Sequence, residues 1–346
     1  MPSILDFIKY RYNFKMQDIE NGDLWDIAPA AERVIWTTRR NTSQAGSLEV
    51  VLSEGIHPSD LMIRAGNMVR FGVDDTDYFY GKIHDADIIA SGSDGVRFGF
   101  KAYNHLMLLQ NAISIRRPAG ITASDFFLMV MSQYSNYIQG LGGERINFAV
   151  REPSTSPLSE HIFMNESVHD ILMQTMSSAH IAEPNQFIIK DNLGTIEWRE
   201  LRALRTNHVL GDESYVRNYT YIVTINEQTY NIVRVVRDNV DIGMRDVWQR
   251  HDSSNVRRWW ARQIIIDADT YMTDAQISEV IDLHLKAFNR PHRRKMQEAV
   301  GIPGIEAGSG IQTRIQRLTI DHGFWCEKVE HIYSSQPHIM NVEVKI

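Results

Sequence analysis

The sequence predicts a mixed, β-rich (α+β) fold in which two β-rich parts flank an α+β module. Three observations support this fold class. Apolar and polar residues alternate in short runs through the first and last thirds of the 346-residue chain, as they do in half-buried strands. The middle third changes to helical spacing, and a motif near the start of the chain occurs again near its end.

The first third contains the clearest strand signals. The stretch "SLEVVLS" places Leu48, Val50 and Leu52 on one face of a strand. The stretch "HDADIIASGSDGVRFGFKAYN" consists of two runs separated by Ser93-Asp94-Gly95. A turn containing Asp-Gly between two such runs predicts a β-hairpin.

The middle of the chain predicts two helices and a hairpin. One helix starts near Ser124 and is stopped by "GLGG", and another starts near Asn165. The stretch "FIIKDNLGTIEW" indicates a hairpin that follows them. The apolar positions of the two helices are Phe127, Val130, Met131, Tyr134 and Ile138, then Val168, Ile171, Leu172, Thr175 and Ala179.

The last third returns to strands, with one helix among them. The stretch "NYTYIVTINEQTYNIVRVV" predicts a hairpin, and "HIMNVEVKI" predicts a terminal strand. Thr273 and Gln276 have the spacing of a capping box. The helix that they open ends before Pro291.

The repeated motif indicates a duplicated β-rich domain. "RAGNMVRFGV" and "EAGSGIQTRI" share a charged residue, Ala-Gly, a small polar residue and an alternating run. "YFYGKIHDADI" follows the first and "FWCEKVEHIY" the second, with a four-residue insertion in the second copy. Glycine at these places allows a tight bend before a strand. The alignment makes Ala65, Gly66 and Lys82 equivalent to Ala307, Gly308 and Lys328.

Composition excludes several classes of protein. With 43 acidic and 36 basic residues the net charge is −7, which argues against an extended nucleic-acid-binding surface. Cys326 is the only cysteine, so the chain has no internal disulfide and no cysteine-based zinc site, and we interpret it as a small buried residue of a strand. The N-terminal stretch lacks the pattern of a secretory signal, which predicts cytoplasmic synthesis.

No local pattern predicts catalysis, a cofactor or a metal site. His161 and His169 are not at ligand spacing on a helix, and the other histidines show no metal pattern either. The acidic run "VDDTDY" lacks the glycine and terminal glutamate of a calcium loop and indicates a hairpin tip. Phosphate loops, dinucleotide fingerprints and nucleophile elbows are missing from the sequence.

Two short stretches suggest contacts with a partner. The run "RPHRRK" contains Arg290, Arg293, Arg294 and Lys295 and follows a predicted helix. It is either a solvated helix exit, favoured by the helix dipole, or a contact with an acidic partner surface. Trp259 and Trp260 follow two arginines, and we interpret them as core or interface anchors.

Several stretches together resemble the tail hub (baseplate hub) proteins of contractile phage tails and phage-tail-like bacteriocins. They are "VIWTTRRNTSQAGSLEVVLSEG", "AGNMVRFGVDDTDYFYGKIHDAD", "YNHLMLLQN", "LKAFNRPHRRKMQEAVGIPGIEAGSGIQTRI" and "FWCEKVEHIYSSQPHIMNVEVKI". The resemblance is strongest at the two ends of the chain. The middle module and the stretch from Trp248 to Asp267 match poorly.

This resemblance implies a structural role and a domain plan. The plan has a first tube-like β-barrel in residues 1–118, the α+β module in 119–205, and a second tube-like β-barrel in 206–346 with a helical excursion at 273–288. Hub proteins of this kind form a homotrimer whose six barrels match the six-fold tail tube on one side. The other side accepts the trimeric spike.

The resemblance also implies where the protein acts and leaves two alternatives. The expected partners are the tail tube protein, the spike protein and other baseplate proteins, without sequence-specific nucleic acid or membrane insertion. The expected location is the tail baseplate of a virion or phage-tail-like particle, assembled in the host bacterial cytoplasm. The alternatives are a tail-associated cell-wall hydrolase and a carbohydrate-binding receptor-recognition module.

Overall fold

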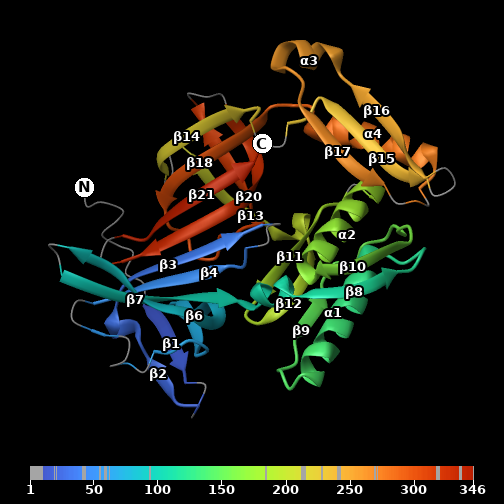
Figure 1. The fold of residues 1–346 in the computed structure, drawn as a ribbon. Helices are drawn as coiled ribbons and strands as arrows, with labels where there is room; N and C mark the ends of the chain where they lie inside the picture. The colour runs from blue at the N-terminus through green and yellow to red at the C-terminus, as the bar shows by residue number, and fades with distance from the viewer. Residues whose placement is uncertain are drawn as a thin grey trace. The chain divides into compact units, whose positions relative to one another are not determined.

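A computed structural model describes most of the chain, which forms two compact units (Figure 1). Unit 1 comprises residues 1–219 and 296–344, and unit 2 comprises 220–295 with 345–346. The described residues are 11–345 without 19, 21, 41–43, 54–55, 58–60, 62, 93–94, 184, 212–215, 227–228, 240–242, 269, 271, 317–319 and 335–336. Among these residues, no helix is long and apolar enough to cross a membrane.

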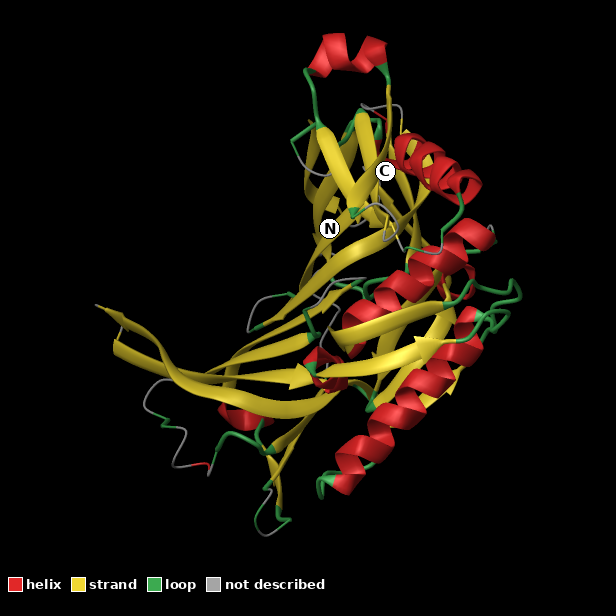
Figure 2. Cartoon of the chain, turned by 45° about the vertical axis from the view of Figure 1, so that its right-hand side comes forward, coloured by secondary structure: helices red, strands yellow, loops and turns green. Residues whose placement is uncertain are grey.

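A 13-stranded sheet is the largest element of the fold, and Figure 2 shows its strands in yellow. Its main path runs in the order β14-β18-β21-β20-β3-β4-β7-β6-β5-β1-β2, and β13 and β19 lie off this path. The strands are β1 Tyr12–Gln17, β2 Leu24–Asp26, β3 Ala31–Arg39, β4 Ser47–Leu52, β5 Met68–Val73, β6 Thr76–Gly92, β7 Gly95–Asn104, β13 Arg205–Gly211, β14 Val216–Thr224, β18 His292–Val300, β19 Gly310–Ile315, β20 Ile320–Tyr333 and β21 Ile339–Lys345.

One order of five strands occurs twice within this sheet. The first copy runs β3-β4-β7-β6-β5, and the second runs β14-β18-β21-β20-β19, with every strand at the same place in the chain order of its copy. A sixth strand precedes each copy and pairs with its β5 or β19. Here the copies differ, because β1 is antiparallel to β5 whereas β13 is parallel to β19.

The two copies meet where β20 pairs antiparallel with β3. The pairing joins them into one continuous sheet. The described strands of a single chain therefore form no closed barrel, and the two-barrel architecture is not confirmed. The chain is β-rich with a mixed α+β fold, as the sequence predicts.

The core of the first copy follows the alternation of its strands. Leu48, Val50 and Leu52 are fully buried, as the pattern of this strand predicts. The hairpin predicted around Ser93-Asp94-Gly95 is also present, because β6 and β7 pair from Gly81–Asn104 to Gly92–Gly95. Residues 93 and 94 of its turn lie outside the described residues.

The α+β module has its own core. Its helices are α1 Ala123–Gly140 and α2 Val168–Ala182, and Thr122 and Ser167 cap them by accepting the N–H groups of Asp125 and Asp170. Nine of the ten predicted apolar positions of these helices are buried, and Ile138 is half-buried. The remaining elements are β8 Ala112–Arg117, β9 Asn147–Val150, β10 His161–Ser167, β11 Phe187–Asn192, β12 Thr195–Glu200 and the 3-10 helices His105–Gln110 and Leu201–Leu204.

The strands of this module form two small sheets. β8 precedes position 119 but pairs with β10, so the module takes in residues before the predicted boundary. β11 and β12 form the predicted hairpin, in which Leu193 and Gly194 both have positive φ. β9 adds to β12 in parallel.

Unit 2 is larger than the predicted helical excursion. It contains the sheet β16-β15-β17 and two helices, which come between β14 and β18 in the chain, where the first copy has only the short β3–β4 connection. The predicted hairpin over residues 218–236 is wrong, because β14 and β15 belong to different sheets. The elements are β15 Ile232–Asn239, β16 Met244–His251, α3 Ser253–Trp259, β17 Gln263–Ala268 and α4 Asp274–Phe288.

Helix α4 covers the small sheet of unit 2. The predicted capping box between Thr273 and Gln276 is present at its start. Ile277 and Ile281 are buried against Val233 and Val235 of β15. The apolar side of α4 is therefore buried within unit 2 itself.

Candidate assembly surface

Gly66 and Gly308 have the same backbone geometry, with φ of 96° and 90°. The Gly66 N–H donates to the carbonyl of Ile83 at 2.7 Å, and the Gly308 N–H donates to the carbonyl of Cys326 at 2.8 Å. The pairing is reciprocal. The N–H groups of Ile83 and Cys326 donate to the backbone carbonyls of Asn67 and Ser309, the residues that follow the two glycines. Positive φ at both turns explains the need for glycine.

Lys82 and Lys328 do not occupy equivalent positions. Lys82 is paired with Met68, two residues after Gly66. Two residues after Gly308, the partner of Gly310 is Trp325. The second hairpin is longer than the first by one residue, whereas aligning the two lysines requires a four-residue insertion. The alignment of the lysines was therefore wrong.

The long strands β6 and β20 share a further irregularity. The pairing of β6 with β7 shifts between Ile83 and Asp85, and the pairing of β20 with β21 shifts between Cys326 and Lys328. Both bulges directly follow the residue that is bonded to the turn glycine. They make Asp85 the equivalent of Lys328.

The surroundings of the two Ala-Gly turns differ. Ala307 is only 5% exposed, and its N–H donates to Oγ1 of Thr38 on β3 at 2.8 Å. Ala65, at the same place in the first copy, is exposed. The turn of the second copy contacts the first copy through Thr38, and it also packs against Ile188 of the module, whereas Ala65 in the turn of the first copy is exposed.

The junction between β20 and β3 is closed by polar and aromatic contacts. The Arg40 N–H donates to the Glu327 carbonyl at 2.8 Å, and the two side chains form an ion pair. Further along, the rings of Trp36 and His331 stack with centroids 5.0 Å apart. This junction is the place where the chain itself shows how one copy binds the next.

Two histidines, His331 and His338, form a hydrogen-bonded pair beside this junction. Nε2–H of His331 donates to the carbonyl of Ile305 at 2.6 Å, so Nδ1 of His331 is an acceptor for Nε2–H of His338 at 2.9 Å. Burial lowers the pKa of His331 to about 4 and that of His338 to about 3. Both rings are therefore neutral at pH 7. His331 lies in a strand and His338 follows the turn after it, and this spacing matches no known pattern of metal ligands or paired histidines in a sequence.

Most of the basic run, residues 290–295, belongs to a strand and not to a loop after α4. Strand β18 begins at His292, shortly after α4 ends at Phe288. Nε of Arg290 donates to the carbonyl of Ala287 at 3.2 Å, which satisfies the helix end. The side chains of Arg293, Arg294 and Lys295 lie outside the described residues.

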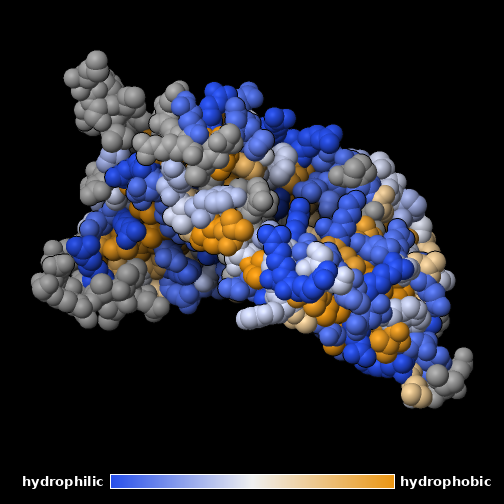
Figure 3. Space-filling model, turned by 90° about the horizontal axis from the view of Figure 1, so that it is seen from above, coloured by the Kyte–Doolittle hydropathy of each residue, from blue (hydrophilic) through white to orange (hydrophobic). Residues whose placement is uncertain are grey.

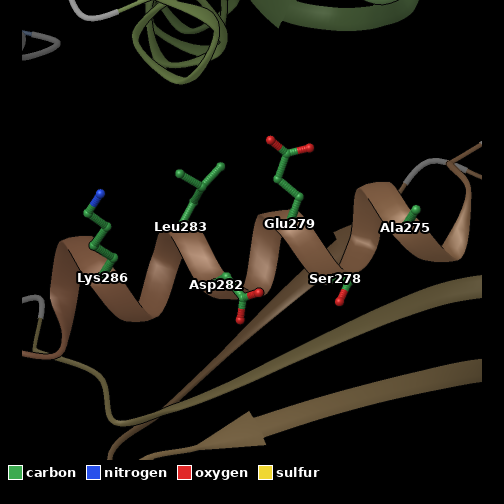
Figure 4. A pocket seen from close by; sticks show the side chains of 6 residues that line it. All are labelled: Ala275, Ser278, Glu279, Asp282, Leu283 and Lys286. Atoms are coloured by element: carbon green, nitrogen blue, oxygen red, sulfur yellow. The ribbon is translucent and has the colours of Figure 1, made fainter.

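A shallow, open depression of about 490 Å³ runs along α4. Figure 4 shows that Glu279, Leu283 and Lys286 point away from the sheet of unit 2, while Ser278 and Asp282 point toward it. Nη1 of Arg250 pairs with Asp282 across this inner side. All lining residues come from one helix, and this open face lacks the enclosure of a typical small-molecule site.

The described residues hold no metal cluster. No group of three or more histidine, cysteine or acidic side chains among them is placed to bind an ion. Asp74 and Asp75 form the tip between β5 and β6, and Oδ1 of Asp77 accepts from Nδ2 of Asn13 at 3.1 Å. Cys326 is buried, and burial raises the pKa of its thiol to about 12, so it is unreactive.

Comparison with known proteins identifies the family. The family model described as YQBQ-like matches residues 34–345. The chain belongs to the YQBQ-like family. No curated protein matches this YQBQ-like chain by sequence.

Solved structures share the fold of this YQBQ-like chain at low sequence identity. The 43 kDa tail protein of prophage MuSo2 from Shewanella oneidensis is 10% identical with a TM-score of 0.66, over 96% of this chain and 97% of that one. A tail protein from Neisseria meningitidis MC58 is 12% identical with a TM-score of 0.67, over 97% of both chains. A type VI secretion component of E. coli, c3393, is 9% identical with a TM-score of 0.50, over 96% of this chain and 76% of that one.

The resemblance to tail proteins is thus confirmed at the level of the fold. The likeness covers nearly the whole chain, including the module and the stretch from Trp248 to Asp267, which the sequence motifs matched poorly.

Proposed function

We propose that this protein is a structural hub of a contractile phage or phage-tail-like baseplate. In this proposal three chains form a ring of six similar β-domains. The ring joins a hexameric tail tube to a trimeric spike. The observation that carries the proposal is the strand order written twice in one sheet. Duplication within a chain lets a three-fold assembly offer six similar surfaces.

The fold of the relatives supports the same function. Two of them are described as tail proteins, and c3393 is described as structurally similar to the T4 bacteriophage tail proteins gp27 and gp5. In this proposal the two copies are tube-like β-domains. Each open sheet is completed by its neighbours, because exposed strand edges favour pairing.

The proposal includes partners and a location. The tail tube protein would bind one side of the ring and the spike protein the other, with other baseplate proteins around it. The particle, either a virion or a headless bacteriocin, would assemble in the host cytoplasm. Residues Arg290, Arg293, Arg294 and Lys295 are proposed to contact an acidic partner surface.

The proposed role is not enzymatic. The only thiol is buried and holds its proton, and the depression on α4 is open and lined by one helix. Purified protein incubated with peptidoglycan is expected to release no soluble fragments. Dose-dependent release that disappears on substitution of one acidic residue would instead support the cell-wall hydrolase.

The test of the hub is the assembly state. Light scattering after size exclusion is expected to give a trimer mass, and electron microscopy is expected to show a ring of six similar domains. A dimer or a tetramer would contradict the proposal. Binding to the tube protein should weaken as salt rises if the basic run forms an ionic contact, because salt screens exposed charges. Binding to the tube protein that does not change with salt concentration would contradict an ionic contact of the basic run.

A further inference from the structure

Strand β20 shows how one edge of a long strand serves two partners. One edge of β20 pairs with β21. On its other edge, Ile320–Trp325 pairs with β19, and Lys328–Tyr333, beyond the bulge, pairs with β3. The second half of this edge is thus filled by the first strand of the other copy.

Strand β6 has the same two halves but fills only one of them. Its early residues pair with β5 as far as Lys82, and its other edge pairs with β7 as far as Gly92. Within the described part of the chain, no strand pairs with the β5 side of this strand beyond the bulge after Ile83. Figure 1 shows the β6–β7 hairpin (teal) reaching out from the sheet. An isolated two-stranded hairpin is marginally stable in water, so a third strand would stabilise it.

Strand β14 is the counterpart of β3, and none of the described strands pairs with its outer edge. It ends the main path of the sheet, and β18 is its one neighbour there. Its side chains Tyr221, Ile222 and Val223 are 37%, 40% and 55% exposed. An apolar strand at an open edge is a template for pairing with another chain.

On the face that Figure 3 shows, surface hydrophobicity does not single out one docking site. In the view of Figure 3 the apolar patches are small and are separated by polar ones. The open backbone edges and the internal repeat are the more specific signals. The two Ala-Gly turns agree with this, because the Ala307 N–H donates to Thr38 of β3 whereas Ala65, its counterpart, is exposed.

We infer that Asp85–Gly92 of β6 pairs antiparallel with β14 of a second copy of this chain, as β20 pairs with β3 within one chain. The inference rests on the proposed hub function and names the contact that would close its ring. Each chain offers one β6 edge and one β14 edge, so the contact is head-to-tail. A ring of three chains would then contain three β20–β3 junctions and three β6–β14 junctions.

Cysteine cross-linking tests this pairing directly. The native Cys326 is buried and unreactive, so introduced cysteines report alone. Asp85→Cys, or Ala86→Cys for the opposite face, is combined in turn with Tyr219→Cys, Tyr221→Cys or Val223→Cys. Asp85→Cys with Leu141→Cys is the matched control, since Leu141 is 69% exposed at the end of α1.

Mild oxidation should join chains at one register of β14. The cross-linked fraction there is expected to exceed the control about tenfold or more, because strands held in one ladder keep the two thiols at a high effective concentration. The covalent products should stop at three chains. If no β14 position exceeds the control, the pairing is wrong.

The assembly state separates failure of the pairing from failure of the hub. A trimer without β14 cross-links overturns the pairing and leaves the hub intact. A protein that stays monomeric and does not cross-link overturns both. Cross-linked ladders that run past three chains support the pairing and contradict the trimeric hub.

Hydrogen exchange of the unmodified protein gives a second measurement. Amides of residues 85–92 and 216–224 should exchange about tenfold or more slowly in the assembled protein than in dilute monomer, because ladder bonds protect them. Amides at the end of α1 should not change between the two states. Equal exchange of 85–92 in both states would overturn the pairing without any substitution.

Discussion

Trp36 of β3 and His331 of β20 lie directly opposite each other, with their rings stacked 5.0 Å apart and 17° from parallel. The stack continues through Tyr333 to His338, whose ring centroid is 4.0 Å from that of Tyr333. These aromatic contacts join the first copy of the repeat to the second. The stability of the junction between the copies therefore depends on two neutral histidines.

Acid should destabilise this junction between pH 6.5 and about 4. Burial lowers the pKa of His331 to about 4, below its ordinary value of 6.5, so the unfolded chain binds a proton in this range that the folded chain does not. Stability is complete above the unfolded pKa and falls as pH drops toward the folded pKa. The loss for His331 alone is roughly 3 kcal/mol in the free energy of unfolding, measured by urea denaturation at several pH values.

Two variants at this junction separate its titration from general acid effects. His331→Gln should be less stable at pH 7.5 but should show a smaller loss between pH 6.5 and 4. His322→Gln, which changes an exposed histidine of the same strand, should keep the full loss. An unchanged pH dependence in His331→Gln would contradict the assignment.

The two turn glycines should differ in their tolerance of alanine. Both glycines have positive φ, so backbone strain in Gly66→Ala and in Gly308→Ala should lower the free energy of unfolding by about 1–2 kcal/mol each. A Cβ on Gly308 would also lie 2.7 Å from Cδ1 of Ile188, so Gly308→Ala should be the more destabilising. Urea denaturation of both variants measures the difference. Equal losses would mean that the module gives way around Gly308.

Local patterns predicted the elements of this fold well. The alternation around Val50 and the helical spacing of Val130 fix which face is buried, since burial follows the period of each element. The partner of each strand is not a local property. The stretch from Asn218 to Val236 reads as a hairpin, yet its two strands enter different sheets because a whole unit is inserted after the first.

The candidate site was predicted only in part for the same reason. The motif located the turns at Gly66 and Gly308, where the backbone itself requires glycine. It misplaced Lys328, because matching side chains can be aligned by a gap that the hydrogen-bond register does not contain. The pair of His331 with Trp36 depends on contact between residues far apart in the chain, which no spacing rule reports.

The buried carboxylate of Glu197 should be important to the α+β module. It accepts from Nε and Nη2 of Arg151 at 2.8 and 2.6 Å and from Nδ2 of Asn192 at 3.1 Å. Burial raises the pKa of this carboxyl, but the hydrogen bonds from Asn192 and Arg151 outweigh it and hold the pKa below its ordinary value. Glu197→Gln should therefore lower the free energy of unfolding by about 2 kcal/mol at pH 7.

An exposed ion pair provides the control for Glu197. Glu160 pairs with Arg116 at 2.5 Å, but both side chains are largely exposed. Glu160→Gln should change the free energy of unfolding by less than about 0.5 kcal/mol. The difference between the Glu197 and Glu160 variants should shrink toward pH 3, because the stability from a carboxyl with a lowered pKa is complete above its unfolded pKa and is lost as pH falls toward the folded pKa. Similar losses in both variants at pH 7 would contradict this role for Glu197.

Trp260 should be replaceable by glycine without loss of stability. Its side chain is 85% exposed and its φ is 64°, a conformation that costs a non-glycine residue about 1–2 kcal/mol. The backbone is held there by buried Asn231, whose Nδ2 donates to the Trp260 carbonyl at 2.7 Å and whose Oδ1 accepts from the Arg262 N–H at 2.9 Å.

Trp260→Gly should thus raise the free energy of unfolding of unit 2 slightly or leave it unchanged, as measured by thermal and urea denaturation. Asn231→Ala should lower it by about 2 kcal/mol, because it leaves the Arg262 N–H and the Trp260 carbonyl without this partner. A loss above about 1 kcal/mol in Trp260→Gly would show that the indole packs in the folded protein. Full stability of that variant would support the interpretation of Trp260 as an interface anchor, since a strained and exposed tryptophan then contributes nothing to folding.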